Sequence, residues 1–306
     1  MVTGGAGFIG SFLCRKLLER ENKVTAFDNL SAGHEEWLPQ QSEEFKLVKG
    51  DLLDKKTLSE EMKGVDTVFH YAANPDVRAA MSDTRVHFDQ NILATFNVLE
   101  AMRESETARE LVFASSSVVY GVPEKIPTPE SYGPLLPISM YGSSKLAAEA
   151  MIASYSDNYG ISATMMRYAN IIGGRAHGVT FDFVNKLKKS PGELEILGDG
   201  TQTKSYLLLD DCVEGTLFAA EKTKKLEVFN LGSEDQLNVK KIADIIVEAM
   251  KLESVGYNFT GGKAWMGDVK IMLLDIGKIK ALGWSPKHGS EEAVRTAVER
   301  MLKGEP

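Results

Sequence analysis

The chain opens with Val2-Thr3-Gly4-Gly5-Ala6-Gly7-Phe8-Ile9-Gly10, and the next eight or so residues show apolar positions with helical periodicity. This order predicts a strand, a glycine turn and a helix. The glycines allow a tight turn and let the backbone approach a pyrophosphate, whose charge is attracted by the amides at the start of the helix. The spacing fits both Gly5-x-Gly7-x-x-Gly10 and Gly4-x-x-Gly7-x-x-Gly10, so it predicts a dinucleotide site without choosing between dinucleotide-binding families.

An acidic residue ends the next predicted strand. The β-like run at residues 23–28 ends in Asp28, 18 residues after Gly10. A carboxylate at this spacing is typical of one that binds the adenine-ribose hydroxyls of a dinucleotide, although a solvated acid at a strand end is the alternative. It would repel the additional phosphate of NADP, and no arginine follows in residues 29–31. We therefore expect NAD as the cofactor.

Short apolar strands alternate with helices over the first half of the chain. Strands are predicted at residues 45–51, 66–73 and 110–114, and helices near 57–63 and 84–103. This alternation predicts an α/β fold with a Rossmann-type, doubly wound parallel sheet that is covered by helices on both faces. Ligands of such sheets bind beyond the carboxyl ends of the strands, where Asp51, residues 72–75 and residues 115–117 lie.

The pattern changes after about residue 170. Strands at 193–197 and 204–209 and helices near 181–189, 211–222, 239–251 and 290–303 no longer alternate strictly. We expect residues 1–170 to form an NAD-binding Rossmann domain, to which some later segments return. Residues 171–306 would form mainly a smaller, mixed α/β substrate-binding domain.

A tyrosine and a lysine stand four residues apart in Tyr141-Gly142-Ser143-Ser144-Lys145, after the proline-rich residues 121–139. On a helix, both side chains would project from one face. A free tyrosine loses its proton near pH ~10, so a tyrosine base at neutral pH needs help of roughly three pKa units, and a nearby ammonium is one source. An amphipathic helix with a partly buried aromatic and a solvated lysine is the alternative, but the upstream dinucleotide pattern favours a catalytic pair.

Composition excludes several other classes. The 306 residues carry a net charge of −8, which argues against binding to nucleic acid. No apolar run reaches membrane-spanning length and the chain opens on a glycine turn rather than a signal peptide, so we expect a cytoplasmic protein without a membrane partner. Cys14 and Cys212 are expected to be reduced and buried, and the singly scattered histidines suggest no metal site.

In this order the motifs resemble those of the extended short-chain dehydrogenase/reductases, and within them the UDP-glucose (UDP-galactose) 4-epimerases. The resemblance covers nearly the whole chain and rests on Thr3-Gly4-Gly5-Ala6-Gly7-Phe8-Ile9-Gly10, Asp28-Asn29-Leu30-Ser31-Ala32-Gly33, Ser115-Ser116-Ser117-Val118-Val119-Tyr120-Gly121, Tyr141-Gly142-Ser143-Ser144-Lys145, Arg167-Tyr168-Ala169-Asn170, Leu197-Gly198-Asp199-Gly200-Thr201-Gln202-Thr203 and Leu282-Gly283-Trp284. It implies NAD-dependent epimerisation at carbon 4 of a UDP-hexose through a transient 4-keto intermediate. It also implies a homodimer built from the helices near 84–103 and 141–159.

The resemblance assigns roles to individual residues. Tyr141 would take the proton of the sugar 4-hydroxyl as hydride leaves carbon 4 for the nicotinamide. Lys145 would bind the nicotinamide ribose and lower the pKa of the tyrosine. Ser116 would bridge the sugar oxygen and Tyr141. The implied cofactor-binding residues are Gly4, Gly7, Phe8, Ile9, Gly10, Asp28, Asn29, Leu30, Ser31, Ala32, Gly33, Asp51, Leu52, Tyr71, Ala72, Ala73, Asn74, Pro75, Asn91, Ser115, Tyr141, Lys145 and Tyr168. The implied substrate-binding residues are Ser116, Tyr141, Asn170, Arg175 and Lys204.

Two departures concern the grip on the diphosphate. Lys204 stands where relatives carry an arginine that pairs with the phosphates. Its ammonium is a single point charge, whereas a guanidinium can bind a phosphate through two nitrogens. Trp265 lies before the late Gly267-Asp268, where relatives often have arginine. Arg175 or Lys263 would then contribute.

Related reactions of the same fold are the main alternatives. Nucleotide-sugar 4,6-dehydratases and decarboxylases typically carry Asp or Glu one or two residues after the catalytic Ser/Thr, whereas this chain has Ser117 and Val118. Simple epimerisation is therefore favoured. Epimerisation of UDP-N-acetylglucosamine or UDP-glucuronate stays open. An NAD-binding regulator without activity is disfavoured by the intact Ser116, Tyr141 and Lys145.

Overall fold

The computed structural model describes residues 1–175, 178–262 and 264–305. The chain forms two compact units. The first contains Met1–Gly121, Leu135–Arg167 and Thr216–Phe229, and the second contains Val122–Pro134, Tyr168–Gly215 and Asn230–Pro306. The chain therefore passes between the units several times. A domain boundary after residue 170 stays a prediction.

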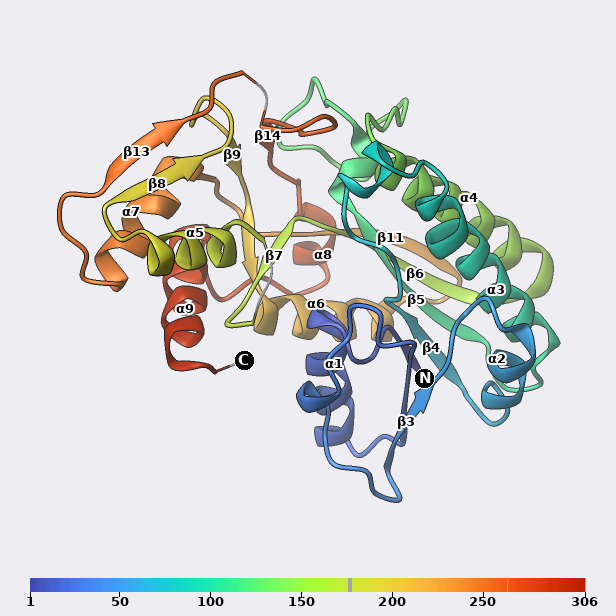
Figure 1. Cartoon of the computed structure of the whole chain (residues 1–306). Helices are drawn as coiled ribbons and strands as arrows, with labels where there is room; N and C mark the ends of the chain where they lie inside the picture. Colours follow the sequence, from blue (N-terminus) through green and yellow to red (C-terminus); the bar gives the residue numbers. More distant parts are fainter. Residues whose placement is uncertain (176–177, 263, 306) are drawn as a thin grey trace. The chain divides into compact units, whose positions relative to one another are not determined.

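A seven-stranded sheet with the order β11-β6-β5-β4-β1-β2-β3 forms the centre of the first unit (Figure 1). The pairings of β1 through β5 are parallel, and the order reverses between β1 and β4, the point at which such sheets bind ligands. The predicted Rossmann-type sheet is confirmed. Its strands are β1 (Val2–Thr3), β2 (Val24–Asp28), β3 (Phe45–Lys49), β4 (Thr67–His70), β5 (Glu110–Ser116), β6 (Ser162–Tyr168) and β11 (Leu226–Leu231), and the last two end in the second unit.

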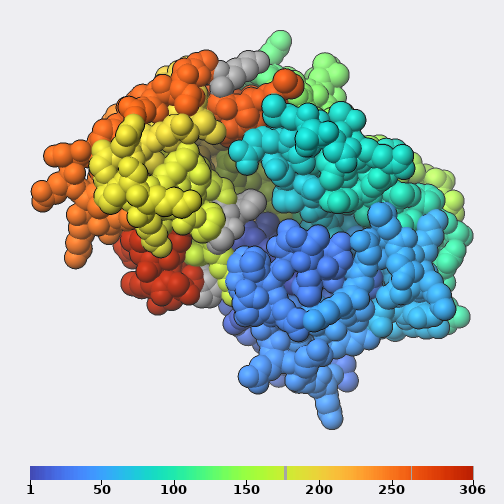
Figure 2. Space-filling view, in the orientation of Figure 1, coloured from blue at the N-terminus to red at the C-terminus, as the bar shows by residue number. Residues whose placement is uncertain are grey.

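Helices cover both faces of this sheet. In Figure 1, α2 (Lys55–Glu61), α3 (Ala94–Glu104) and α4 (Met140–Tyr159) lie on one face and α1 (Phe8–Glu19) on the other. Large buried apolar side chains pack together in this core and include Leu99, Met102, Leu111, Phe113 and Ile152. The neighbouring strands β1, β2 and β3 and their connections form the blue region of the first unit in Figure 2.

One predicted helix differs in the structure. Residues 84–103 are predicted to form one helix, whereas the chain forms a π-helix at Phe88–Leu93 that continues into α3. The hydroxyl of Thr95 donates to the carbonyl oxygen of Asn91 at 2.6 Å. In a regular α-helix that carbonyl accepts from the amide of Thr95, so the side chain competes with the helical bond. The wider turn lies next to the candidate site.

The second unit contains small sheets with the orders β10-β7, β12-β9-β14 and β13-β8. Their strands are β7 (Asn170–Ile172), β8 (Glu193–Ile196), β9 (Thr203–Lys204), β10 (Tyr206–Leu208), β12 (Leu237–Asn238), β13 (Gly256–Phe259) and β14 (Ile271–Met272). The helices are α5 (Gly178–Lys189), α7 (Val239–Ala249), α8 (Gly277–Ala281) and α9 (Ser290–Lys303), and α6 (Leu209–Lys222) runs through both units. An apolar core that includes Phe183, Ile242 and Val294 unites α5, α7 and α9.

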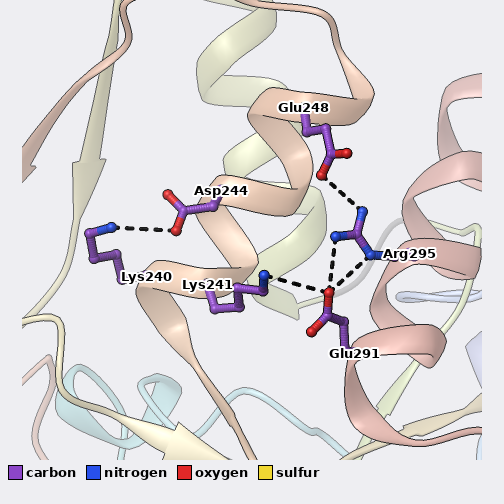
Figure 3. Close-up of polar contacts among 6 residues, drawn as sticks. All are labelled: Lys240, Lys241, Asp244, Glu248, Glu291 and Arg295. Carbon is purple, nitrogen blue, oxygen red and sulfur yellow. Dashed lines mark hydrogen bonds and ion pairs between the residues drawn. The ribbon is translucent and has the colours of Figure 1, made fainter.

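Exposed ion pairs connect α7 with α9 at the surface (Figure 3). The guanidinium of Arg295 contacts Glu291 at 2.9 Å and Glu248 at 3.0 Å, and Lys241 contacts Glu291 at 3.5 Å. Ion pairs in this setting each contribute about 0–1 kcal/mol to stability.

Two further features bear on the expectations from sequence. Cys14 and Cys212 are buried, as expected, and neither forms a disulfide. Within the described ranges, no helix has the length and apolar character needed to span a bilayer.

Candidate active site

The glycine turn packs against the end of β4. Gly4 has a φ of 67°, and a Cβ atom there would lie 2.6 Å from the amide nitrogen of Ala72. A side chain at Gly10 would collide with the carbonyl oxygen of Gly4. The N-cap of α1 is Gly7, which has no side chain to bond to the free amides, and the first turn carries no acidic residue. The positive end of this helix and the bare turn therefore fit a dinucleotide pyrophosphate.

The carboxylate of Asp28 is buried and organises the loop beside the turn. Its Oδ2 accepts from the amide of Ala6 at 2.9 Å and its Oδ1 from the amide of Leu30 at 2.8 Å. A carboxylate oxygen can accept more than one hydrogen bond, so these contacts are compatible with ribose binding. Asn29 in turn donates to Asp51 Oδ2 at 3.0 Å, which joins the ends of β2 and β3.

The end of β4, the π-helix and α4 meet at Asn91. Its Oδ1 accepts from the amide of Asn74 at 2.7 Å, and its Nδ2 donates to Ser144 Oγ at 2.8 Å. The structure thus brings the predicted cofactor segment at residues 71–75 to the helix that carries Tyr141. Tyr168, another predicted cofactor residue, is buried at the end of β6.

Ser116 and Tyr141 meet where β5 ends and α4 begins. The Ser116 hydroxyl lies close enough to the Tyr141 phenol to favour its ionised form. The Oγ of Ser139 caps α4 by accepting from the amide of Gly142 at 3.0 Å, which fixes the turn that carries Tyr141. Burial raises the pKa of Tyr141 to about 12, and the neighbouring Ser116 side chain opposes this shift.

Lys145 lies one turn further along α4 and is buried. Its Nζ donates to the carbonyl of Ala114 at 2.7 Å and lies 5.9 Å from the centroid of the Tyr141 ring. Burial lowers the pKa of Lys145 to about 7, and the carboxylate of Glu149 opposes this. Lowering of the Tyr141 pKa by Lys145 stays a prediction; without it, burial keeps the phenol protonated at neutral pH.

A buried ion pair that the sequence analysis missed lies behind Lys145. Arg167 binds Glu149 through two nitrogens, Nη2 to Oε2 at 2.6 Å and Nε to Oε1 at 3.0 Å. Ser115 donates to Glu149 Oε1 at 2.5 Å, and Arg167 Nη1 donates to the hydroxyl of Tyr120 at 3.0 Å. This network joins β5, β6 and α4 around the strand end that carries Ser116. The sequence feature that could have pointed to this network is Glu149, which follows Lys145 by four residues and so lies on the same helix face.

The predicted substrate-binding residues of the second unit are Asn170, Arg175 and Lys204. Lys204 Nζ contacts Asp268 Oδ1 at 2.7 Å and lies 5.1 Å from the ring of Trp265. The side chains of Lys204 and Asp268 are only 15% and 4% exposed. The cation predicted to hold the diphosphate is therefore already paired with a buried carboxylate.

Asn170 lies at the start of β7 in the second unit. Asn170 Nδ2 donates to the carbonyl of Ser205 at 3.0 Å. Lys263 lies outside the described residues. Among the residues that the structure describes, no cluster of three or more His, Cys, Asp or Glu side chains is arranged to hold a metal ion.

Comparisons with known proteins agree with this geometry. Residues 1–232 match the model of the "NAD dependent epimerase/dehydratase family". The chain is 35% identical over 309 residues to a putative UDP-glucose 4-epimerase of Methanocaldococcus jannaschii, with 98% of this chain and 97% of the relative covered. It is similar to the crystal structure of a UDP-galactose 4-epimerase, with a TM-score of 0.89, 42% identity and coverage of 99% and 98%. A UDP-N-acetylglucosamine 4-epimerase from Methanobrevibacter ruminantium M1 is similar with a TM-score of 0.90, 28% identity and coverage of 99% and 97%.

Proposed function

The chain belongs to the NAD-dependent epimerase/dehydratase family, and from this premise we propose that it epimerises carbon 4 of a UDP-hexose, with UDP-glucose and UDP-galactose as the substrate pair. The observation that carries the proposal is the meeting of Ser116, Tyr141 and Lys145 at the carboxyl end of β5. Oxidation of one sugar hydroxyl and reduction of the ketone at the same carbon need one acid/base group for the proton, together with a cofactor that would take and return the hydride.

In the proposed reaction the phenol oxygen of Tyr141 takes the proton of the sugar 4-hydroxyl and later returns it. Ser116, whose side chain lies beside Tyr141, holds the same sugar oxygen in place. NAD, when bound along the glycine turn, Asp28 and Lys145, supplies the hydride acceptor and a positive charge. Lys145 adds charge beside the phenol, which favours its deprotonated form.

The positions after Ser116 favour epimerisation over dehydration. Ser117 begins a 3₁₀ turn and is buried, and Val118 is apolar. Neither side chain exchanges a proton at neutral pH, so neither supplies the acid/base group needed at carbon 5 for elimination of water. A homodimer through α3 and α4 remains part of the proposal.

A panel of UDP-sugars tests this function. Purified protein is incubated separately with UDP-glucose, UDP-N-acetylglucosamine and UDP-glucuronate, and the products are separated by carbohydrate chromatography. We expect UDP-galactose from UDP-glucose as the fastest conversion. Turnover of only one of the other two sugars would reassign the substrate, and retention of NAD without any turnover would support an NAD-binding regulator.

The pairing of Lys204 yields a second prediction. If its ammonium is shared between Asp268 and the substrate diphosphate, Lys204→Ala removes a charge-assisted hydrogen bond and raises KM for the UDP-sugar about tenfold or more, with NAD content unchanged. Lys270→Ala is the matched control, because Lys270 is an exposed lysine of the same unit that pairs with Asp199 at 2.8 Å. Equal KM values for both variants would transfer the role to another cation such as Arg175.

A further inference from the structure

A buried histidine of the first unit has no role in the proposed reaction. His70, at the end of β4, is 1% exposed and contacts two threonines. Thr3 Oγ1 lies 2.7 Å from its Nδ1, and Thr95 Oγ1 lies 3.0 Å from its Nε2. Both threonines are themselves buried. Because a buried ring nitrogen is costly when unpaired, these two contacts define how the imidazole is held.

The proton positions in this cluster follow from what each group can donate. The carbonyl oxygen of Asn91 only accepts, so the single hydroxyl proton of Thr95 points toward it, along the 2.6 Å contact. Thr95 Oγ1 must therefore accept from Nε2–H of His70. A neutral imidazole carries one proton, which leaves Nδ1 to accept from the hydroxyl of Thr3. Of the two neutral forms of His70, only the one protonated on Nε2 satisfies both contacts.

The surroundings favour this neutral form. Burial lowers the pKa of His70 to about 3, and the positive charge of Lys145 adds to the lowering. The Phe113 ring packs beside the imidazole at a centroid distance of 5.7 Å. Both effects favour an uncharged His70 at neutral pH.

The hydrogen bonds extend from His70 toward both parts of the candidate site. On one side, Thr3 ends β1 directly before Gly4, and its Oγ1 also accepts from the amide of Ala72 at 3.4 Å. On the other side, Asn91 donates to Ser144 Oγ at 2.8 Å, and Ser144 Oγ donates to the carbonyl of Tyr141 at 2.7 Å. The connected groups thus run from the glycine turn to the first turn of α4.

We propose that His70 is a positioning residue with two separable arms. The Nδ1 arm, through Thr3, holds the end of β1 and the glycine turn and so serves the cofactor site. The Nε2 arm, through Thr95 and Asn91, holds the turn of α4 that carries Tyr141 and so serves proton transfer. This inference rests on the proposed function, since it assigns the arms to NAD binding and to catalysis by Tyr141.

Two amide substitutions separate the arms. In His70→Gln the amide nitrogen takes the place of Nε2 and keeps the donor to Thr95, while the acceptor for Thr3 is lost. In His70→Asn the amide oxygen takes the place of Nδ1 and keeps the acceptor for Thr3, while the donor to Thr95 is lost. Loss of one buried hydrogen bond should change the quantity that depends on that arm by about tenfold. This quantity is the NAD dissociation constant for the Nδ1 arm and kcat for the Nε2 arm.

The expected result is opposite for the two variants. His70→Gln raises the NAD dissociation constant of cofactor-stripped protein about tenfold and changes kcat at saturating NAD by less than about twofold. His70→Asn lowers kcat about tenfold with the NAD dissociation constant and the KM for UDP-sugar unchanged. Thr95→Val reproduces the kcat loss, and the double variant His70→Asn/Thr95→Val is no slower than either single variant. Equal losses of both parameters in both amide variants would mean that His70 acts by packing alone and would overturn the proposal.

Nitrogen NMR of the unsubstituted protein checks the same inference without activity or substitution. The imidazole of His70 should be neutral and protonated on Nε2 throughout the range from about pH 5 to about pH 9. A charged ring or an Nδ1–H tautomer would contradict the proposal even if epimerisation is found.

Failure of the proposed function has a different signature, namely a protein that binds NAD and shows the Nε2–H form but converts no UDP-sugar. In that case the Nδ1 arm is still tested by comparing the NAD dissociation constants of His70→Gln and His70→Asn. The proposal requires the constant to be raised in His70→Gln alone.

Discussion

Tyr141→Phe should lower turnover of the UDP-sugar by at least about a hundredfold, the loss typical of a missing general base. The substitution removes only the hydroxyl that exchanges the proton with the sugar. The ring keeps its contacts, including the edge-on packing against His87 at a centroid distance of 5.7 Å. NAD content, measured in the supernatant of denatured protein, should therefore match that of the unsubstituted protein.

Tyr155→Phe is the matched control for this experiment. Tyr155 lies on the same helix α4, and its hydroxyl donates to Glu100 Oε1 at 2.7 Å rather than contacting Ser116. Its turnover should stay within a few-fold of the unsubstituted value. Near-normal turnover of folded Tyr141→Phe, or an equal loss in Tyr155→Phe, would remove Tyr141 from the proposed reaction.

Arg167→Met should lower the free energy of unfolding by about 3–5 kcal/mol, because it leaves the carboxylate of Glu149 buried without its counter-charge. The single hydroxyl of Ser115 at 2.5 Å cannot replace the two-nitrogen contact of the guanidinium. Urea unfolding monitored by circular dichroism measures the difference, with the m value as a check on two-state behaviour.

Arg295→Met provides the comparison, since Arg295 also contacts two carboxylates (Figure 3). Unlike Arg167, its side chain is 39% exposed. Its loss should be no more than about 1 kcal/mol. Replacing both buried partners, as Glu149→Gln/Arg167→Met, should recover part of the loss, because no buried charge then remains unpaired. Similar losses for the buried and the exposed arginine would show that the Glu149 pair does not hold β6 to α4.

Local patterns were sufficient to predict the first half of the fold. The glycine turn and the apolar strands that follow it have strong local signals in the sequence. These strands are β1 to β5, which pair in parallel. The π-helix at Phe88–Leu93 was not predicted, because it depends on one hydroxyl, that of Thr95, competing for a backbone carbonyl. Strand β11 was also missed, since Leu226–Leu231 becomes a strand by joining the edge of the sheet next to β6.

In the candidate site, too, the residues with local sequence signals were predictable and their distant partners were not. Tyr141 and Lys145 share α4, and the side chain of Ser116 lies beside that of Tyr141. The supporting groups were missed because their partners are far apart along the chain, 18 residues for Glu149 and Arg167 and 67 residues for Thr3 and His70. The burial that raises the pKa of Tyr141 could not be predicted either, since it depends on the packing of the whole unit.

Transfer of isotope from UDP-glucose deuterated at carbon 4 tests the proposed epimerisation most directly. Hydride removed from carbon 4 should return to the other face of the same carbon, because neither Ser117 nor Val118 can serve as the acid/base group for loss of water. We expect UDP-galactose that keeps its deuterium at carbon 4 and takes up no solvent hydrogen at carbon 5. Deuterium at carbon 6, or solvent hydrogen at carbon 5, would contradict 4-epimerisation and indicate a dehydratase or 5-epimerase reaction.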